Sequence, residues 1–129
     1  MSIRKRIALA TAALALGSGF AVPPAAAASA ATYTCHYSTS GEYAYAGYYS
    51  GTTVQPSSTV VTNSGIEAQC LLRRSGFNPG TIDGVFGSNS KAAAKNMQAG
   101  LNECCHAGLD EDGKIGRESW PWLRRLAHL

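Results

Sequence analysis

The chain has 129 residues, of which 45% are hydrophobic and 15% are charged, and its formal net charge is +3. This length allows one small domain with additional segments, and it excludes large architectures such as the (β/α)₈ barrel, which needs about 250 residues. Three of the eleven basic residues lie at positions 4–6, which leaves eight basic against eight acidic residues in the rest. A neutral chain lacks the basic surface of nucleic-acid-binding proteins, so no nucleic acid partner is expected.

Residues 1–30 have the three parts of a secretory signal peptide. Arg4-Lys5-Arg6 is the positive start, an apolar run follows from Ile7 to Val22, and Ala28-Ser29-Ala30 fits the small-residue cleavage pattern. We expect cleavage after Ala30, with Ala28 as a nearby alternative. The apolar run is shorter than the roughly 20 residues of a membrane span, which disfavours an uncleaved anchor. The mature protein is therefore expected to be secreted, extracellular or cell-wall associated, and not attached to a membrane.

The chain contains four cysteines, Cys35, Cys70, Cys104 and Cys105. An even number of cysteines in a small exported protein indicates disulfide bonds. A bond between the adjacent Cys104 and Cys105 would be strained, so we expect Cys35 and Cys70 each to bond one of that pair, in either of two ways. The alternative is a metal site with His106 as an extra ligand, but the spacing lacks the paired arms of structural zinc sites. No metal and no cofactor is expected.

Residues 31–62 are rich in Tyr, Ser, Thr and Gly, and all six tyrosines lie between positions 33 and 49. Tyr43-Ala44-Tyr45 and Tyr48-Tyr49 are compatible with a short extended segment that glycines interrupt. Because an unpaired Cys35 would be a liability outside the cell, we expect this segment to wrap the domain rather than to be a loose spacer. Stacking of the tyrosines on sugar rings is a less favoured interpretation.

The first predicted helix runs from Ser64 to Arg74. Ser64 and Glu67 match a capping box, and Gly76 supplies a left-handed stop after the helix. Apolar residues lie on two opposite faces, so we expect the main core to cover one face and a disulfide-tethered segment to cover the other. The core face holds Ala68, Leu71 and Leu72, and the opposite face holds Ile66 and Cys70.

Two more helices are predicted from the spacing of apolar residues. The second begins near Ser88–Ser90 and runs to about Glu103. The third begins near Ser119, which we expect to cap it because Pro121 is tolerated only in a first turn. The predicted buried stripes are Ala94, Met97, Leu101 and then Cys104 or Cys105 in the second helix, and Trp120, Leu123 and Ala127 in the third.

Two loops, at residues 83–90 and 112–119, share the pattern D-G-x-apolar-G-x-x-S. We expect the Asp side chain to accept hydrogen bonds from the loop's own amides and the glycines to adopt backbone angles closed to other residues. Phe86 and Ile115 are expected to fill the core, and the serines to cap the following helices. The residues with this predicted structural role are Asp83, Gly84, Phe86, Gly87, Asp112, Gly113 and Gly116.

In this order, the motifs resemble the peptidoglycan-binding domain 1 family, a small three-helix domain of exported bacterial proteins and cell-wall hydrolases. The resemblance covers about residues 64–126. It implies an all-α, compact three-helix domain at residues 63–129 that binds peptidoglycan. The residues that carry it are Gln69, Ile82-Asp83-Gly84-Val85-Phe86-Gly87, Gln98, Asp112-Gly113-Lys114-Ile115-Gly116 and Ser119-Trp120-Pro121.

The chain departs from the family pattern at several positions. Gly65 stands where the family usually has an aliphatic residue, and Met97 replaces the usual phenylalanine. Residues 102–108 look like an insertion, and they carry the adjacent cysteine pair. A ligand surface shared with the family is therefore in doubt at that edge of the domain.

No catalytic motif is recognisable in the sequence. His36, His106 and His128 form neither H-x-H nor H-E-x-x-H, no G-x-S-x-G is present, and all four cysteines are assigned to disulfides. After the binding domain and the Tyr-rich segment, no residues remain for a catalytic domain. The protein is therefore not expected to be an enzyme.

Peptidoglycan offers N-acetylated sugars and short peptides with carboxylates, so its binding favours aromatic faces, amides and arginines. Trp122 lies about 200° around the helix from Trp120 and is expected to be the more exposed of the two tryptophans. Gln69 and Gln98 are expected to be buried and bonded to loop backbone. The candidate ligand-binding residues are Trp122, Asn78, Asn96, Arg73 and Arg124.

Two functions agree with these observations. The first is non-catalytic binding of cell-wall peptidoglycan by an exported stand-alone module. The alternative is an exported protein–protein interaction module that uses the same scaffold to bind a wall-associated protein.

Overall fold

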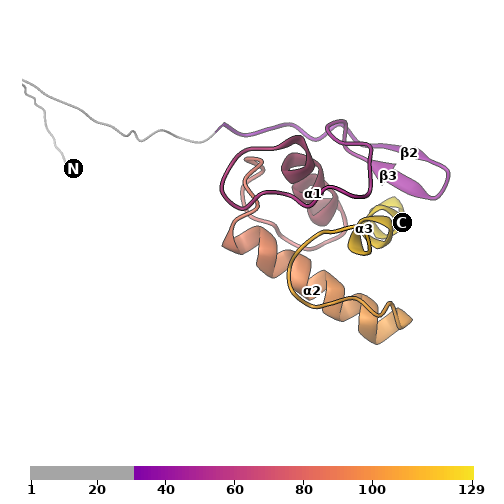
Figure 1. The fold of residues 1–129 in the computed structure, drawn as a ribbon. Helices are drawn as coiled ribbons and strands as arrows, with labels where there is room; N and C mark the ends of the chain where they lie inside the picture. The colour runs from indigo at the N-terminus through magenta and orange to yellow at the C-terminus, as the bar shows by residue number, and fades with distance from the viewer. Residues whose placement is uncertain (1–30) are drawn as a thin grey trace, which may run out of the picture. The chain divides into compact units, whose positions relative to one another are not determined.

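The computed structural model of the protein describes residues 31–129, so the predicted signal peptide at residues 1–30 lies outside the described residues. Three helices and one small hairpin follow along the chain (Figure 1). No helix within residues 31–129 has the length and apolar character needed to cross a membrane. The elements are β2 (Ser38–Ser40), β3 (Tyr43–Tyr45), α1 (Asn63–Arg74), α2 (Ser88–Cys105) and α3 (Ser119–His128).

Helix α1 ends at Arg74, as predicted, but begins one residue before Ser64 and has a different cap. The N-cap residue is Thr62, whose hydroxyl accepts a hydrogen bond from the Gly65 N–H at 2.9 Å. The expected capping box of Ser64 and Glu67 is therefore wrong. Glu67 is fully buried, and its carboxylate instead accepts hydrogen bonds from backbone N–H groups of the N-terminal segment. Every residue from Ser64 to Leu72 is buried, so both faces of α1 are covered, as predicted.

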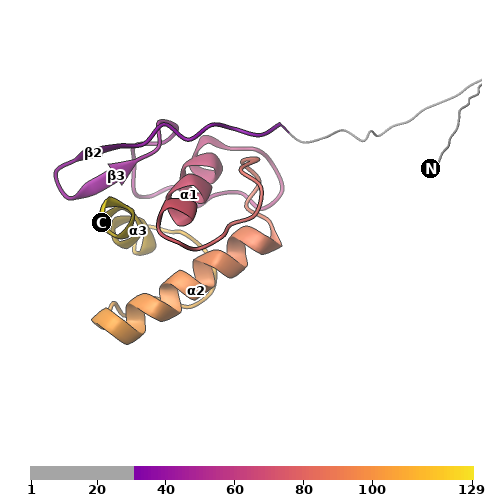
Figure 2. The same ribbon diagram turned by 180° about the vertical axis from the view of Figure 1, so that it is seen from behind.

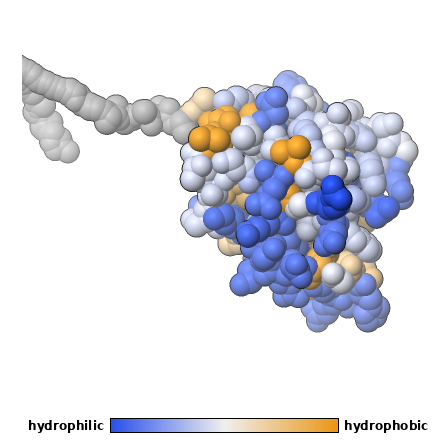
Figure 3. Space-filling model, in the orientation of Figure 1, coloured by the Kyte–Doolittle hydropathy of each residue, from blue (hydrophilic) through white to orange (hydrophobic). Residues whose placement is uncertain are grey.

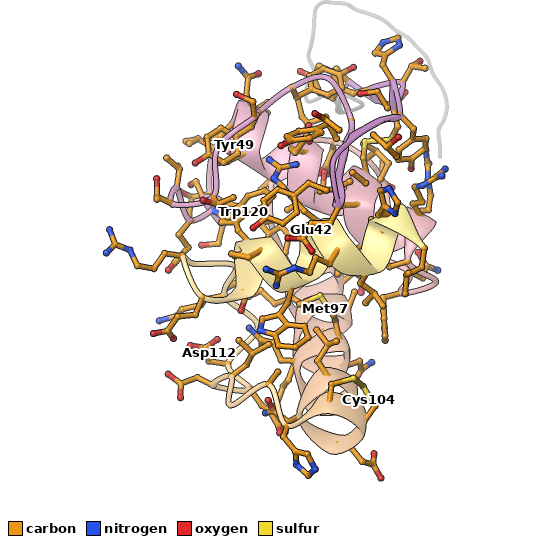
Figure 4. All side chains as sticks on the ribbon, turned by 90° about the vertical axis from the view of Figure 1, so that its right-hand side faces the viewer. Glu42, Tyr49, Met97, Cys104, Asp112 and Trp120 are labelled. Carbon is orange, nitrogen blue, oxygen red and sulfur yellow. A yellow bond between two sulfur atoms is a disulfide. The ribbon has the colours of Figure 1, made fainter. Side chains whose placement is uncertain are left out.

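Helix α2 starts where the sequence predicts and continues to Cys105, two residues beyond the expected end. Its buried stripe contains Ala94, Met97 and Leu101, and Met97 points from α2 toward α3 in Figure 4. The continuation of this stripe to Cys104 and Cys105 is wrong, because both cysteines are exposed. The last turn of α2 extends past the buried stripe, which ends at Leu101.

Helix α3 buries Trp120, Leu123 and Ala127, as predicted. The helix begins at Ser119, but its N-cap residue is Glu118, whose side chain makes no capping hydrogen bond. Trp120 is completely buried, whereas Trp122 is partly exposed, so the predicted difference between the two tryptophans is confirmed.

The N-terminal segment adds a two-stranded sheet, so the described fold is mostly helical rather than all-α. Strands β2 and β3 pair antiparallel, with Ser38 opposite Tyr45 and Ser40 opposite Tyr43. Gly41 has a φ of +60° and makes the tight turn between them possible. Ala44 is fully buried, and the hairpin lies beside α3 in both Figure 1 and Figure 2.

The disulfide pairing differs from both expected pairings. Cys35 bonds Cys70 across a Cα–Cα distance of 5.7 Å, and Cys104 bonds its neighbour Cys105. The N-terminal segment follows α1 closely enough to bring Cys35 onto Cys70, as the bond from the Tyr37 hydroxyl to the Cys70 carbonyl also shows. As expected, a segment tethered by a disulfide covers α1. Its disulfide partner is Cys70 of α1 itself rather than Cys104 or Cys105.

Residues 46–62 pass around α1 (Figure 1) and bond the loop between α1 and α2 through backbone hydrogen bonds. The Phe86 N–H donates to the Ser57 carbonyl at 2.9 Å, and the Thr62 N–H donates to the Gly84 carbonyl at 3.2 Å. The buried Trp120 indole N–H donates to the Val54 carbonyl at 2.8 Å. The Tyr-rich segment therefore wraps the helices, as predicted, and supplies hydrogen-bond partners to their interior.

A buried ion pair joins this segment to two helices. Arg124 of α3 and Glu67 of α1 are both fully buried, and the Arg124 Nη1 lies 2.9 Å from the Glu67 Oε2. The guanidinium also donates to the carbonyls of Ala44, Tyr49 and Gly51. The glutamate accepts from the N–H groups of Ala46, Tyr48 and Tyr49. Because backbone groups satisfy both charges, the pair can stay buried.

Candidate functional site

The first junction between helices is organised by the buried side chain of Gln69. The Gln69 amide nitrogen donates to Asp83 Oδ1 at 3.1 Å and to the Val85 carbonyl at 3.0 Å. It also donates to Ser90 Oγ at 3.0 Å, while the Gln69 oxygen accepts from the Gly84 N–H at 2.8 Å. Asp83 Oδ1 accepts a further bond from the Val85 N–H at 3.0 Å, as expected for the loop aspartate.

The second junction repeats this arrangement around Gln98. Its amide nitrogen donates to the Lys114 carbonyl at 2.9 Å, to Ser119 Oγ at 3.1 Å and, weakly, to Asp112 Oδ1 at 3.4 Å. Its oxygen accepts from the Gly113 N–H at 2.9 Å, and Asp112 Oδ1 accepts from the Lys114 N–H at 2.9 Å. The expectation that both glutamines are buried and bonded to loop backbone is confirmed.

The expected capping role of Ser90 and Ser119 is wrong. Both serines lie inside the first turn of their helices and bond the buried glutamines instead, and the N-cap residues are Gly87 and Glu118. A buried glutamine amide costs free energy unless its donors are satisfied. The serine hydroxyls accept hydrogen bonds from these buried donors.

The loop glycines divide into two groups. Gly84 and Gly113 have φ values of +81° and +75°, a region that favours glycine. A Cβ at Gly113 would also lie 2.7 Å from the Lys91 carbonyl oxygen. Gly87 and Gly116 do not have positive φ, so the expectation of unusual backbone angles is wrong for them. Phe86 and Ile115 are 2% and 0% exposed and fill the core, as expected.

Two of the candidate ligand-binding residues, Asn78 and Asn96, line one surface hollow of about 400 Å³. We call it the amide cleft, because Asn89 lies in it as well and brings a third side-chain amide. Asn78 comes from the loop after α1, whereas Asn89 and Asn96 come from the first half of α2. The complete lining is Gly76, Phe77, Asn78, Gly80, Asn89, Ala92, Ala93 and Asn96.

The three side-chain amides of this cleft differ in the hydrogen bonds that they make within the protein. Asn78 Oδ1 accepts from the Gly80 N–H at 3.0 Å, which closes the loop and leaves the Asn78 NH₂ group as a donor. No hydrogen bond within residues 31–129 uses the Asn89 or Asn96 side chain, and both side chains are exposed. Sequence reasoning missed Asn89, although its spacing of seven residues from Asn96 places both on one helix face.

Trp122 lines a second hollow, of about 390 Å³, which we call the Trp122 cleft. Arg125 covers one face of the indole, with its Cζ 5.8 Å from the ring centre, and it also lies over the Tyr43 ring at 5.6 Å. Arg125 thus connects the Trp122 ring with the hairpin. The complete lining is Ala107, Gly108, Leu109, Arg117, Glu118, Pro121 and Trp122.

The two arginine candidates do not line either cleft. Arg124 is fully buried in the ion pair with Glu67, so the expectation that it meets a ligand carboxylate is wrong. Its charge is used to hold the N-terminal segment. Arg73 is exposed, but its Nη2 lies 3.1 Å from Cys35 Sγ, beside the disulfide. The structure therefore brings Asn78 and Asn96 together and places Trp122 and Arg73 elsewhere.

The tyrosines mostly hold the N-terminal segment to the domain. The Tyr49 and Trp120 rings, both labelled in Figure 4, have their centres 5.2 Å apart. The Tyr49 hydroxyl accepts from the N–H groups of Thr53 and Val54. Burial raises the pKa of Tyr49, but these hydrogen bonds and the Arg124 charge outweigh it, and the net pKa is lowered from 10.0. A further hollow of about 370 Å³ is lined by Tyr45, Gly47, Tyr48, Tyr49 and Ser50.

The surface carries small hydrophobic spots rather than one large patch on the face shown in Figure 3. The exposed large hydrophobic residues include Val54, Val60 and Val61, each between 51% and 57% exposed, all in the segment before α1. Binding to a polar, hydrated ligand through amides and single rings agrees with such a surface better than burial against a large apolar partner.

Comparison with known proteins agrees with the resemblance seen in the motifs. Residues 63–123 match the model of a family described as "Putative peptidoglycan binding domain". No curated protein and no solved structure gave a significant match to the chain. The matched residues contain α1, α2, both glutamine-centred junctions and both clefts. Residues 63–123 of the chain are therefore similar to this family over about half of the chain's length.

Proposed function

We propose that the protein binds bacterial cell-wall peptidoglycan without cleaving it, as an exported module, and that the amide cleft holds the ligand. The observation that carries the proposal is the family match over residues 63–123, which contain every residue that lines the cleft. The Tyr-rich segment lies outside the match and holds the domain together through Glu67 and Arg124.

The chemistry of the amide cleft supports this ligand. Peptidoglycan carries N-acetyl groups on its sugars and amide bonds in its peptides, and each of these groups both donates and accepts hydrogen bonds. The exposed side chains of Asn89 and Asn96 offer the matching donors and acceptors, and the half-buried Phe77 offers an apolar face.

The lining also supports binding without catalysis. The polar side chains of the amide cleft are Asn78, Asn89 and Asn96. Asparagine amides do not titrate in the pH range of general acid–base catalysis, and they are poor nucleophiles. The cleft therefore offers recognition groups and no group suited to breaking a glycosidic or peptide bond.

Retention of the oxidised protein on purified insoluble peptidoglycan tests the proposal. We expect the protein to be retained and Asn96→Ala to weaken retention about three- to tenfold, as for the loss of one neutral hydrogen bond. Lys95→Ala is the matched control, because Lys95 is the exposed neighbour on α2 and does not line the cleft. Equal retention of both variants would remove the amide cleft from the proposal. No retention, with both disulfides intact, would favour a wall-associated protein as the partner.

A further inference from the structure

We propose that the Trp122 cleft is a second subsite for the same polymer, generated by the internal repeat, and that it takes a sugar ring whose attached peptide carries a carboxylate. This inference rests on the proposed function, because it assumes that the amide cleft holds peptidoglycan. It goes further by assigning a second position and a different ligand group to the chain.

The two clefts are built at equivalent positions of the repeat. The offset of 29 residues that relates Gln69 to Gln98 and Asp83 to Asp112 also relates the linings of the clefts. Five positions of the amide cleft have their equivalents in the Trp122 cleft, and the volumes are about 400 and 390 Å³. The equivalent pairs are Asn78 and Ala107, Gly80 and Leu109, Asn89 and Glu118, Ala92 and Pro121, and Ala93 and Trp122.

The glutamine-centred junctions explain why both clefts have the same framework. Each cleft lies between the loop that follows one helix and the first turns of the next helix. In both, the glutamine fixes the loop to that next helix through the same set of hydrogen bonds, whose lengths agree within 0.3 Å. A hollow that the backbone framework produces once is therefore produced again by the second junction.

The side chains change the chemistry of the second cleft. At equivalent positions, a methyl group becomes the Trp122 indole and an amide becomes the Glu118 carboxylate. Leu109 and Pro121 add apolar surface, and Arg117 adds an exposed guanidinium. An indole face suits the C–H face of a sugar ring, and a guanidinium suits a carboxylate.

One face of the Trp122 indole ring is covered by protein, and the ring also lines the cleft. Arg125 covers one side of the indole, and Glu42 on the hairpin holds Arg125 with an Nε–Oε1 distance of 3.2 Å. The ring is therefore supported by protein on that side while it also lines the cleft. An aromatic side chain that is held in place before binding loses little conformational entropy when a ring stacks on it.

Two subsites of unlike chemistry on one rigid domain suit a polymer with a repeating unit. Once one cleft is occupied, the other meets its ligand group at a high effective concentration, which strengthens attachment to the wall well beyond either subsite alone. A short soluble fragment that fills one cleft gains nothing from the other. The inference therefore predicts different behaviour on intact wall and on fragments.

The test combines retention on insoluble peptidoglycan with nuclear magnetic resonance titration by a soluble disaccharide-peptide fragment of peptidoglycan. We expect Trp122→Ala to lower retention on the wall at least tenfold and to leave the fragment-induced shifts of the Asn96 side-chain amide unchanged. Trp122→Phe, which keeps an aromatic face, should recover part of the retention. Arg117→Ala should lower retention too, and Arg117 is exposed, so its replacement leaves the core intact.

The two tryptophans provide an internal control within the titration. The Trp122 indole N–H signal should shift with the fragment, whereas the Trp120 signal should stay, because Trp120 is buried and bonded to the Val54 carbonyl. If the Asn96 amide shifts while Trp122 does not, and Trp122→Ala and Arg117→Ala are retained like the unmodified protein, the second subsite is refuted and the proposed function stands. If the unmodified protein is not retained and neither signal shifts, the proposed function itself fails.

Discussion

The helical repeat and the Tyr-rich segment that wraps it are stabilised in different ways. The repeat is held by short-range patterns that occur twice, with one buried glutamine at each junction. The segment has one small hairpin and is held by contacts with residues far along the chain, above all Glu67, Cys70 and Arg124. The comparison shows that a domain of this size can combine a locally encoded scaffold with a cover whose position depends on a few distant side chains.

The largest expected effect on the free energy of unfolding comes from removing the buried arginine that anchors the Tyr-rich segment. Arg124→Ala leaves Glu67 charged and buried without its partner, and we expect it to lower the free energy of unfolding by about 3–5 kcal/mol. Urea denaturation of the oxidised protein measures this. The matched control is Arg125→Ala, whose pair with Glu42 is 43% and 70% exposed and should contribute less than about 1 kcal/mol. Similar losses in both variants would contradict the view that Arg124 anchors the segment.

The next largest expected effect is the stability lost when a disulfide is removed, and it should differ between the two disulfides. Cys35–Cys70 closes a loop with a sequence separation of 35, and in the chain-entropy model its removal costs about 4 kcal/mol. Cys104–Cys105 links neighbours and constrains the unfolded chain little, so its removal should cost about 1 kcal/mol. Urea denaturation of the double variants Cys35→Ala/Cys70→Ala and Cys104→Ala/Cys105→Ala measures both. A larger loss in the second variant would mean that the adjacent pair supports the fold.

Within the repeat, we expect the two junction glutamines to contribute equally to the free energy of unfolding. Gln69→Ala and Gln98→Ala each leave a buried glycine N–H without its acceptor, and each should cost about 2–3 kcal/mol. Thermal and urea unfolding of the two variants should agree within about 1 kcal/mol, with the exposed Gln55→Ala as a control near zero. A difference of several kcal/mol between the variants would show that the wrapping segment, which bonds the first loop at the Gly84 carbonyl and the Phe86 N–H, makes the junctions unequal.

The smallest effect concerns pH. Because the pKa of Tyr49 is lowered in the folded protein, its ionisation favours the folded state. This contribution is present above the unfolded pKa of about 10 and is lost as the pH falls through the folded pKa. The difference between spectrophotometric titrations of the folded protein and of Tyr49→Phe should show one phenol that ionises below the usual tyrosine pKa of about 10. A difference step at or above that pKa would contradict the lowered pKa of Tyr49.

Much of the repeat could be predicted from the sequence because its signals are local. Apolar spacing located the three helices, the duplicated D-G-x-apolar-G pattern located both loops, and the family resemblance drew attention to the two buried glutamines. The small sheet was harder to predict, because a three-residue strand such as β3 depends on burial of Ala44 against α3 rather than on its own pattern.

Several of the errors come from residues whose partners lie far away in the sequence. Glu67 has the spacing of a capping residue, and Arg124 has the sequence context of a surface cation, yet they bond each other across 57 positions. Cys35 pairs with Cys70 because of the path of the wrapping segment, which no local pattern encodes. In the amide cleft, Asn78 and Asn96 were predicted separately, and only the structure shows that Asn89 joins them.

The sharing of α2 has a consequence for how such a domain can grow. Helix α2 completes the first junction and begins the second, so neither unit of the repeat exists as a separate module. Cutting the chain between the units would leave one of them without half of its packing surface. Lengthening the domain by duplication would therefore proceed in single steps of one loop and one helix added at the C-terminal end, and each step would bring its own glutamine-fixed junction and its own cleft.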